Sequence, residues 1–191
     1  MSWYVQRRAA EGERTGYHLF GDATIVHPGN GPNSDNAIAA TSTGTNGFGG
    51  IAFKIGHGHT LAQLNELATD DMFTTGSCGL GSPRFSVDLT NGTVSGNILF
   101  YIGPPPNYTV CPPNVWTNIG NLATPASLVD DTHLPGGTFY DTYANAQAKY
   151  GTYTITGIAL IADGPNQTVQ FDNTNVNGSI HRYETDQEGD D

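Results

Sequence analysis

The chain has 191 residues, of which only 13% are charged, while 25 are glycine and 11 are proline. This length fits a single domain that buries a core of its own. Few charges and many turn-forming residues favour short strands and loops over long, salt-bridged helices. Seven Lys and Arg against 18 Asp and Glu give a net charge of −11. We therefore expect no nucleic-acid partner, because such a surface repels phosphate, and no membrane insertion, because no apolar run is long enough.

Both ends of the chain are charged and lack periodicity, so we expect them to lie outside the folded domain. The predicted division is an N-terminal arm over 1–16, a folded domain over 17–183 and an acidic, solvated tail over 184–191. The basic start is followed by polar residues rather than by an apolar segment, so no signal peptide can be recognised.

The folded part is a series of short segments rich in β-branched and aromatic residues, separated by Gly, Pro and Asn. Such segments predict strands joined by turns. In chain order they are Tyr17–Val26, interrupted at Gly21 and Asp22, then Ala37–Thr41, Gly49–Ile55, Arg84–Leu89, Asn97–Gly103, Tyr153–Ala162 and Thr168–Asn177. Together they predict an all-β fold, a single antiparallel β-sandwich of jelly-roll type.

Two short helical turns are expected in the connections between strands. Leu61, Leu64 and Leu67 have helical spacing after a possible cap at Thr60, and this turn would close one end of the sandwich. The second is predicted over 142–150, with Asp141 as its cap. The pairs Asp70-Asp71 and Asp130-Asp131 could supply the acid and base of a glycosidase. Adjacent residues on a strand point to opposite faces, so each pair offers only one carboxylate to a given site, and we expect both pairs at turns or helix starts instead.

The two cysteines, Cys78 and Cys111, lie in segments rich in Gly and Pro. This setting predicts one loop-closing disulfide and hence an oxidising compartment. We expect a secreted or extracellular protein. Two buried reduced thiols are the alternative.

The end of the domain, Gln170–Gly178 (QFDNTNVNG), resembles the last strand of jelly-roll, galactose-binding-like modules, which include many carbohydrate-binding modules of extracellular bacterial proteins. A Gly21-Asp22-Ala23 segment near the start is similar to one found in many of them. The resemblance covers most of residues 17–183 as a pattern. It implies a structural calcium ion, with Asp172 as a ligand and help from Asp22.

His57-Gly58-His59 could also aim two imidazoles at one metal ion, since alternate residues of a strand share a face. With Gln63 the segment is similar to the first metal motif of cupins, which has Glu in that place. The second half of that motif is missing, and a polar loop with two exposed histidines is the alternative.

Aromatic residues are the candidates for ligand binding, because exposed rings can stack on the C–H faces of sugars. Tyr101, Tyr108 and Trp116 surround the proline-rich loop, and Tyr140 and Tyr143 surround the second helical turn. The same residues would serve equally well as core or loop anchors.

The leading hypothesis is therefore a secreted, non-catalytic β-sandwich that binds a polysaccharide or cell-surface glycan. A structural subunit of an extracellular fibre, surface layer or capsid is the alternative, because the arm could add a strand to a neighbour's sheet and so drive self-assembly into oligomers or fibres. A cupin-like metal-dependent enzyme is third. The usual hydrolase and nucleotide-binding motifs are absent from the sequence.

Overall fold

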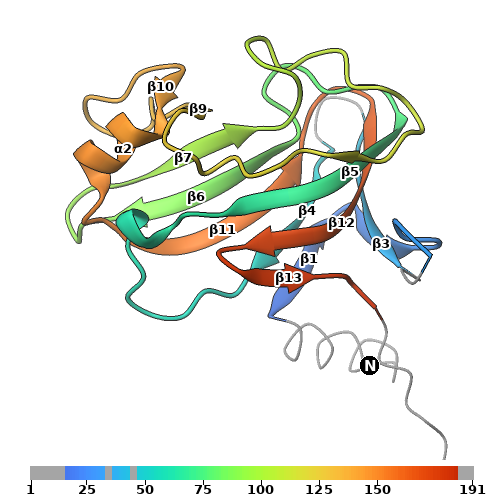
Figure 1. Ribbon diagram of the computed structural model, residues 1–191, viewed down its shortest axis with the longest axis horizontal. Coiled ribbons are helices and arrows are strands. Elements are labelled where there is room, and N and C mark those ends of the chain that lie inside the picture. Colours follow the sequence, from blue (N-terminus) through green and yellow to red (C-terminus); the bar gives the residue numbers. More distant parts are fainter. Residues whose placement is uncertain (1–15, 33–35, 44–46, 185–191) are drawn as a thin grey trace, which may run out of the picture.

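The computed structural model describes residues 16–32, 36–43 and 47–184. It is an antiparallel β-sandwich of two sheets packed face to face (Figure 1), as the sequence predicted. The first sheet has the order β1 (Tyr17–Gly21), β4 (Gly49–Phe53), β11 (Thr154–Ala162), β6 (Arg84–Thr90) and β7 (Ser95–Tyr101). The second has the order β2 (Ala23–Val26), β3 (Ala37–Ser42), β12 (Gln167–Val176), β5 (Leu67–Thr75) and β8 (Thr117–Asn118), with β13 (Ser179–His181) pairing to β12.

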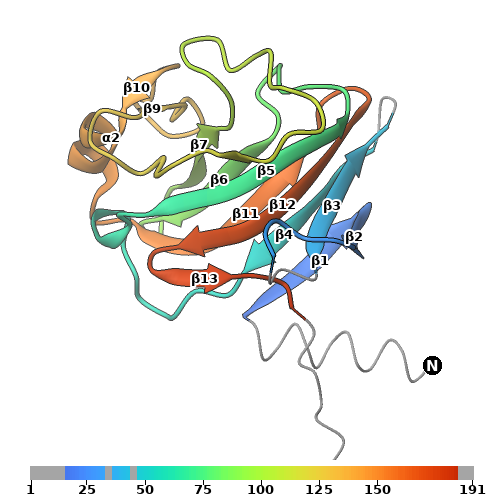
Figure 2. The same ribbon diagram turned by 45° about the vertical axis from the view of Figure 1, so that its right-hand side comes forward.

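Smaller elements close the edges and ends of the sandwich. The 3₁₀ turn η1 (Leu61–Gln63) is followed at once by β5, and helix α2 (Tyr143–Tyr150) follows a two-stranded ribbon of β9 (Leu128–Val129) and β10 (Asp141–Thr142). In Figures 1 and 2 this ribbon and α2 lie beside β7, the edge strand of the first sheet. A backbone bridge between Leu99 and Asp130 joins β7 to the residue after β9.

The prediction of Asp141 as the N-cap of the helix α2 was wrong. Thr142, not Asp141, is the N-cap of α2, and its hydroxyl accepts a hydrogen bond from the backbone N–H of Asn145. The reason is that the helix begins at Tyr143, so Thr142, with its extended backbone, is the residue directly before the first helical position. Asp141 supports the same turn from outside, accepting hydrogen bonds from the Thr142 backbone and the Asn145 amide.

The core lies between the two sheets and follows the alternation of their strands. Along β12, Val169 and Phe171 are buried on the inner face, as the period of two requires. The fully buried side chains of the core include Ile38, Ile51, Leu67, Phe73, Phe85, Ile98, Phe100 and Tyr143.

Strands that follow each other in sequence often belong to different sheets. β1 and β2 were read as one interrupted strand, but the break at Gly21 and Asp22 sends them to opposite sheets. Gly21 has φ +58, and a Cβ there would collide with the carbonyl of Phe48, so the chain turns where only glycine fits. Likewise β11 and β12, on either side of the turn at 163–166, cross from one sheet to the other.

The prediction of a turn or helix start at Asp70 and Asp71 was wrong. Both residues lie in the middle of β5, a strand that the sequence analysis missed. The two aspartates interrupt the apolar pattern by which a strand is recognised in the sequence. The strand forms nevertheless, because tertiary contacts rather than local propensity hold it in the sheet. Asp130 and Asp131 do lie where β9 passes into a turn.

The predicted N-terminal arm and acidic tail fall, except for Gly16 and Glu184, outside the described residues. Within the described part of the chain, no helix is long and apolar enough to cross a membrane.

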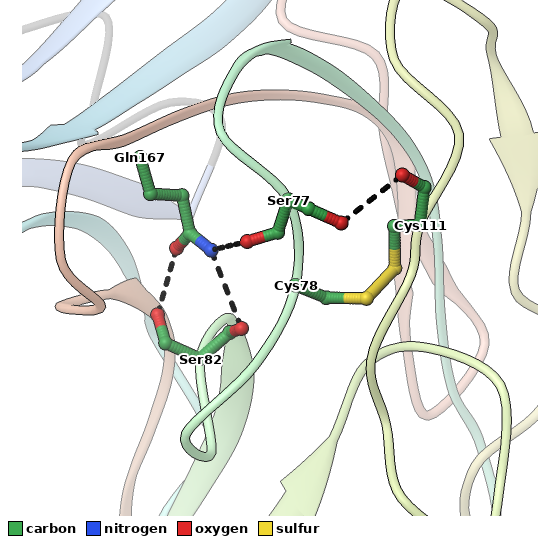
Figure 3. The surroundings of a disulfide bond; sticks show 5 residues. All are labelled: Ser77, Cys78, Ser82, Cys111 and Gln167. Atoms are coloured by element: carbon green, nitrogen blue, oxygen red, sulfur yellow. Dashed lines mark hydrogen bonds between the residues drawn. A yellow bond between two sulfur atoms is a disulfide. The ribbon is translucent and has the colours of Figure 1, made fainter.

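The disulfide between Cys78 and Cys111 is present, as predicted, and spans 33 residues of sequence. It ties the β5–β6 loop to the loop after β7 (Figure 3). Next to it, the Gln167 amide donates to the carbonyls of Ser77 and Ser82 at 2.8 and 3.3 Å and accepts from the Ser82 hydroxyl at 2.8 Å. The β5–β6 loop is thus fastened to the start of β12 as well as to the loop after β7.

Candidate functional site

Four aromatic rings gather on the outer face of the first sheet, away from the main core. Tyr101 is the last residue of β7, Tyr108 lies in the following loop, and Phe139 and Tyr140 precede β10. The ring centroids of Tyr101 lie 5.7, 6.1 and 6.2 Å from those of Tyr108, Phe139 and Tyr140. We call these four residues the aromatic cluster. Three of them, Tyr101, Tyr108 and Tyr140, were singled out from the sequence as candidates for ligand binding.

The pleat of β7 explains why the cluster faces outward. Ile98 and Phe100 of this strand are buried in the main core, so Leu99 and Tyr101 between and after them point to the other side of the sheet. There they form a separate apolar group with Tyr108 and Tyr140. The cluster therefore stands on a rigid strand rather than on a loop alone.

The cluster is buried at its base and open at its tip. Tyr101 and Tyr108 are almost covered, whereas the Phe139 side chain is 57% exposed. The rings of Phe139 and Tyr140 are 4.1 Å apart between centroids. The exposed Phe139 ring and the half-buried Tyr140 ring therefore rest on a buried pair, which holds this apolar surface in place.

Two more large apolar side chains are exposed on the loops that border the cluster. Leu80 is 87% exposed and Val110 is 83% exposed. Leu80 lies two residues after Cys78, and Val110 lies one residue before Cys111, the two cysteines of the disulfide. A Cβ added at Gly81, next to Leu80, would lie 3.0 Å from the Tyr101 ring, so the β5–β6 loop touches the base of the cluster.

The backbone around the cluster is strained. Leu80, Tyr108, Val110 and Tyr140 all have positive φ, between 51° and 66°, a region that non-glycine residues rarely occupy and that is least favourable for β-branched Val110. Strain of about 1–3 kcal/mol at each such residue persists only where the surroundings enforce it, and it concentrates at functional sites. Leu80 and Val110 lie next to the disulfide between Cys78 and Cys111 in sequence.

Polar groups surround the base of the cluster. The Tyr101 hydroxyl donates to a carboxylate oxygen of Asp130 at 2.6 Å. Although burial acts to raise the pKa of Asp130, hydrogen bonds from Thr132 and Tyr101 keep that pKa below its usual value. Burial and the same carboxylate raise the pKa of Tyr101. Asp130 is therefore an ionised anchor for the cluster at neutral pH.

Two hydroxyls of the cluster remain available for a ligand. Within the described residues, neither the Tyr108 nor the Tyr140 hydroxyl donates a hydrogen bond to another protein group. Burial, and then the neighbouring Tyr140, raise the pKa of Tyr108, so it stays a protonated donor at neutral pH. The site thus combines exposed rings with hydrogen-bonding groups.

The remaining two aromatic candidates lie elsewhere. Trp116 is half-buried just before β8, at the edge of the second sheet. Tyr143 is in the main core, where its ring packs on Phe100 and its hydroxyl donates to the carbonyl of Leu64 at 2.7 Å. Tyr143 therefore anchors α2 to the η1 turn. Of the two roles considered for this residue, ligand binding and core packing, only core packing matches its position.

The residues proposed for calcium are not brought together. The carbonyl of Asp22 accepts from the Thr41 backbone, and Thr41 pairs with Thr168, four residues along β12 from Asp172. That separation is about 13 Å at the rise of a strand. The buried Asp172 carboxylate accepts from the backbones of Asn30 and Asn173, both at 2.7 Å. The two residues do not fit a shared ion, and calcium binding stays a prediction.

The two histidines of the proposed metal pair also differ in position. His59 borders a cavity of about 580 Å³ at the far end of β12, together with Lys54, Gln63 and His181, whereas His57 is exposed outside it. Among the described residues, no three His, Cys, Asp or Glu side chains lie close enough to hold a metal ion.

Phe139, Leu80 and Val110 were missed by the sequence analysis. Leu80 and Val110 are isolated apolar residues in Gly- and Pro-rich segments, and no periodicity marks them. Phe139 was adjacent to a predicted candidate, and its position just before Tyr140 in a glycine-flanked loop was the one signal that could have identified it.

No protein-family model matches the chain, and no curated protein matches its sequence. Among solved structures, the family 11 carbohydrate-binding module of a cellulosomal cellulase of Clostridium thermocellum is similar, with a TM-score of 0.45 and 13% sequence identity. The alignment covers 88% of this chain and 90% of that module.

Proposed function

We propose that this protein is a secreted, non-catalytic module that binds a polysaccharide or cell-surface glycan through the aromatic cluster. The observation that carries the proposal is the exposed Phe139 ring against Tyr140, displayed on the outer face of a rigid sheet. The disulfide supports an oxidising, extracellular environment.

The chemistry of the cluster suits a sugar. A pyranose ring has apolar C–H faces, which stack on aromatic rings, and hydroxyls at its rim, which need donors and acceptors. Phe139 and Tyr140 provide the rings, and the hydroxyls of Tyr108 and Tyr140 provide hydrogen bonds. Leu80 and Val110 extend the apolar surface on the neighbouring loops.

The rigidity of the cluster favours binding. A disulfide, the hydrogen bonds of Gln167 and a strand hold the loops before any ligand arrives. A preformed site loses less conformational entropy on binding, so a shallow surface can retain a ligand. The net charge of −11 favours neutral over acidic polysaccharides, since like charges repel.

The test is retention on an array of neutral polysaccharides. We expect Phe139→Ala to weaken binding at least about tenfold, equivalent to about 1.4 kcal/mol, without changing the melting temperature. Phe48→Ala is the matched control, because Phe48 is also exposed, at 47%, but packs on Phe20 near β1 and not on the cluster.

Equal loss in both variants, or unchanged retention of Phe139→Ala, would contradict the proposal. So would a wild-type protein that no glycan on the array retains. Titration calorimetry with calcium, and melting with and without EDTA, test the ion separately; no heat and no shift in melting would remove calcium from the account.

A further inference from the structure

A second, smaller cavity is lined in part by the loop after β7, which also carries Tyr108 of the aromatic cluster. It has a volume of about 210 Å³ and lies where the chain passes from β7 to β8. Pro104, Pro112, Ile119 and Leu122 form apolar walls, and the disulfide borders it through Cys111. Among its lining residues, Asp71 and Thr117 have polar side chains.

Asp71 is buried without a partner. The residue is only 3% exposed, and its side chain lies on the inner face of β5, since its cross-strand neighbours are the core residue Phe171 and the cavity residue Thr117. Within the described residues, its carboxyl forms no hydrogen bond or ion pair. A buried carboxyl in this condition is costly and calls for an explanation.

The neighbouring carboxyl on the same strand shows the contrast. Asp70 points to the opposite face of β5, where it accepts hydrogen bonds from the side-chain amides of Asn30, Asn118 and Asn173 at 2.8, 2.6 and 2.8 Å. One carboxylate of this pair is therefore satisfied by the protein. The other is directed at a cavity.

The surroundings of Asp71 favour a cation there. Burial, and then the negative charge of Asp70, raise the pKa of Asp71 to about 7. In the part of the chain that the structure describes, no titratable group borders the cavity beside it: β12 presents Phe171, β8 presents Thr117, and the loop presents prolines and a disulfide. No Lys, Arg or His side chain of the described residues borders the cavity to neutralise it.

We propose that this cavity is a binding site for a small organic cation, a primary ammonium on a short apolar stem, held by the Asp71 carboxylate. The ammonium would donate to Asp71 and Thr117, and the stem would pack on the prolines, Ile119 and Leu122. The volume of about 210 Å³ leaves room for several water molecules and therefore for a short alkylammonium.

Other ligands match the cavity less well. A calcium ion needs six to eight oxygen ligands, and the lining offers one carboxyl and one hydroxyl. A sugar would leave most of its hydroxyls against apolar walls, at a cost for each. An ammonium with an alkyl stem needs one carboxylate and an apolar wall, which the cavity supplies.

The experiment is an NMR titration of the intact protein with n-butylammonium, and with n-butanol as the uncharged counterpart of nearly equal shape. We expect saturable shifts at Thr117 and Ile119 with the amine and none with the alcohol. Because only the ionised carboxyl binds, the apparent affinity at pH 6 should be about tenfold lower than at pH 8. The same titration with a lysine amide whose α-amino group is blocked tests whether the cavity accepts the ammonium of a lysine side chain as well as that of a free alkylamine.

Asp71→Asn should abolish the shifts, and Asp88→Asn, a substitution on the exposed face of β6, should leave them unchanged. Equal binding of amine and alcohol, equal affinity at the two pH values, or no saturation by wild-type protein at pH 8 would overturn the proposal. The wild-type comparisons decide the matter even if a variant fails to fold. None of these outcomes depends on whether the aromatic cluster binds a glycan.

Discussion

Single residues in this protein differ sharply in role from neighbours of the same chemical type. Tyr140 and Tyr143 are three positions apart, yet one belongs to the outer aromatic cluster and the other to the main core. Asp70 and Asp71 are adjacent, yet Asp70 accepts three amide hydrogen bonds, whereas Asp71 accepts none from the residues that the structure describes. The pleat of the strand and the packing around it make these distinctions.

The pKa of Asp71 predicts a pH-dependent stability. A carboxyl with a pKa of about 7 in the folded protein and 3.8 as its ordinary value binds more protons in the folded than in the unfolded state between these pH values. The free energy of unfolding therefore falls as pH rises from about 4 to about 7, by at most about 4 kcal/mol.

Asp71→Asn should remove this fall in the free energy of unfolding with rising pH. Urea unfolding should show the variant more stable than wild type at pH 8, by up to about 4 kcal/mol, and nearly equal to it at pH 3. Asp163→Asn should act in the opposite direction, by up to about 1 kcal/mol, because it breaks a partly exposed ion pair with Arg84. A variant no more stable than wild type at pH 8 would contradict the assignment.

Tyr143→Ala tests the distinction between the two tyrosines. It removes a fully buried ring, so we expect a loss of about 3–5 kcal/mol in the free energy of unfolding. Phe139→Ala, which removes a ring exposed by more than half, should stay within about 0.5 kcal/mol of wild type. Similar stabilities for the two variants, measured by chemical denaturation, would show that Tyr143 is not a core residue.

Among the elements, the two loops joined by the disulfide matter most for the proposed site. They place Leu80 and Val110 beside the aromatic cluster. The loop after β7 also lines the smaller cavity, through Gly103, Pro104, Cys111 and Pro112. Neither loop has regular hydrogen bonding of its own along most of its length. Their shape depends on the covalent link and on Gln167.

Replacing both cysteines by serine should lower the free energy of unfolding by about 3–4 kcal/mol, from the chain entropy of a 33-residue separation. Glycan retention should fall in the same variant even at temperatures where it remains folded, because the strained residues at Leu80 and Val110 can then relax. The measurements are denaturant unfolding and retention on the array at low temperature. Full retention by the folded variant would show that the disulfide serves stability alone.

At the scale of the whole molecule, the charge is strongly negative and the proposed glycan site does not use it. The contacts of the aromatic cluster with a neutral sugar are stacking and hydrogen bonds, which salt screens little. Raising the sodium chloride concentration from about 0.05 to about 0.5 M should therefore leave glycan retention unchanged, although the Debye length shortens severalfold. A marked salt dependence would instead indicate recognition of a charged partner.

The amino-acid sequence by itself determined the fold class, the positions of most strands and the disulfide. Short β-branched and aromatic segments between Gly, Pro and Asn identify strands locally, and two cysteines in loops leave one possible pair. It also brought Tyr101, Tyr108 and Tyr140 forward as candidates. Strand β5 was missed because two adjacent aspartates break its pattern.

Only the tertiary structure decided which residues lie close together in space. The assignment of β1 and β2, or of β11 and β12, to different sheets depends on how two layers pack, and no local signal carries that information. Trp116 and Tyr143 separate from the aromatic cluster, and Asp71 meets its cavity, for the same reason. The neighbours of a side chain come from strands that are distant in sequence. The chemistry of a site therefore depends on strand pairing and side-chain burial, which composition and residue spacing do not reveal.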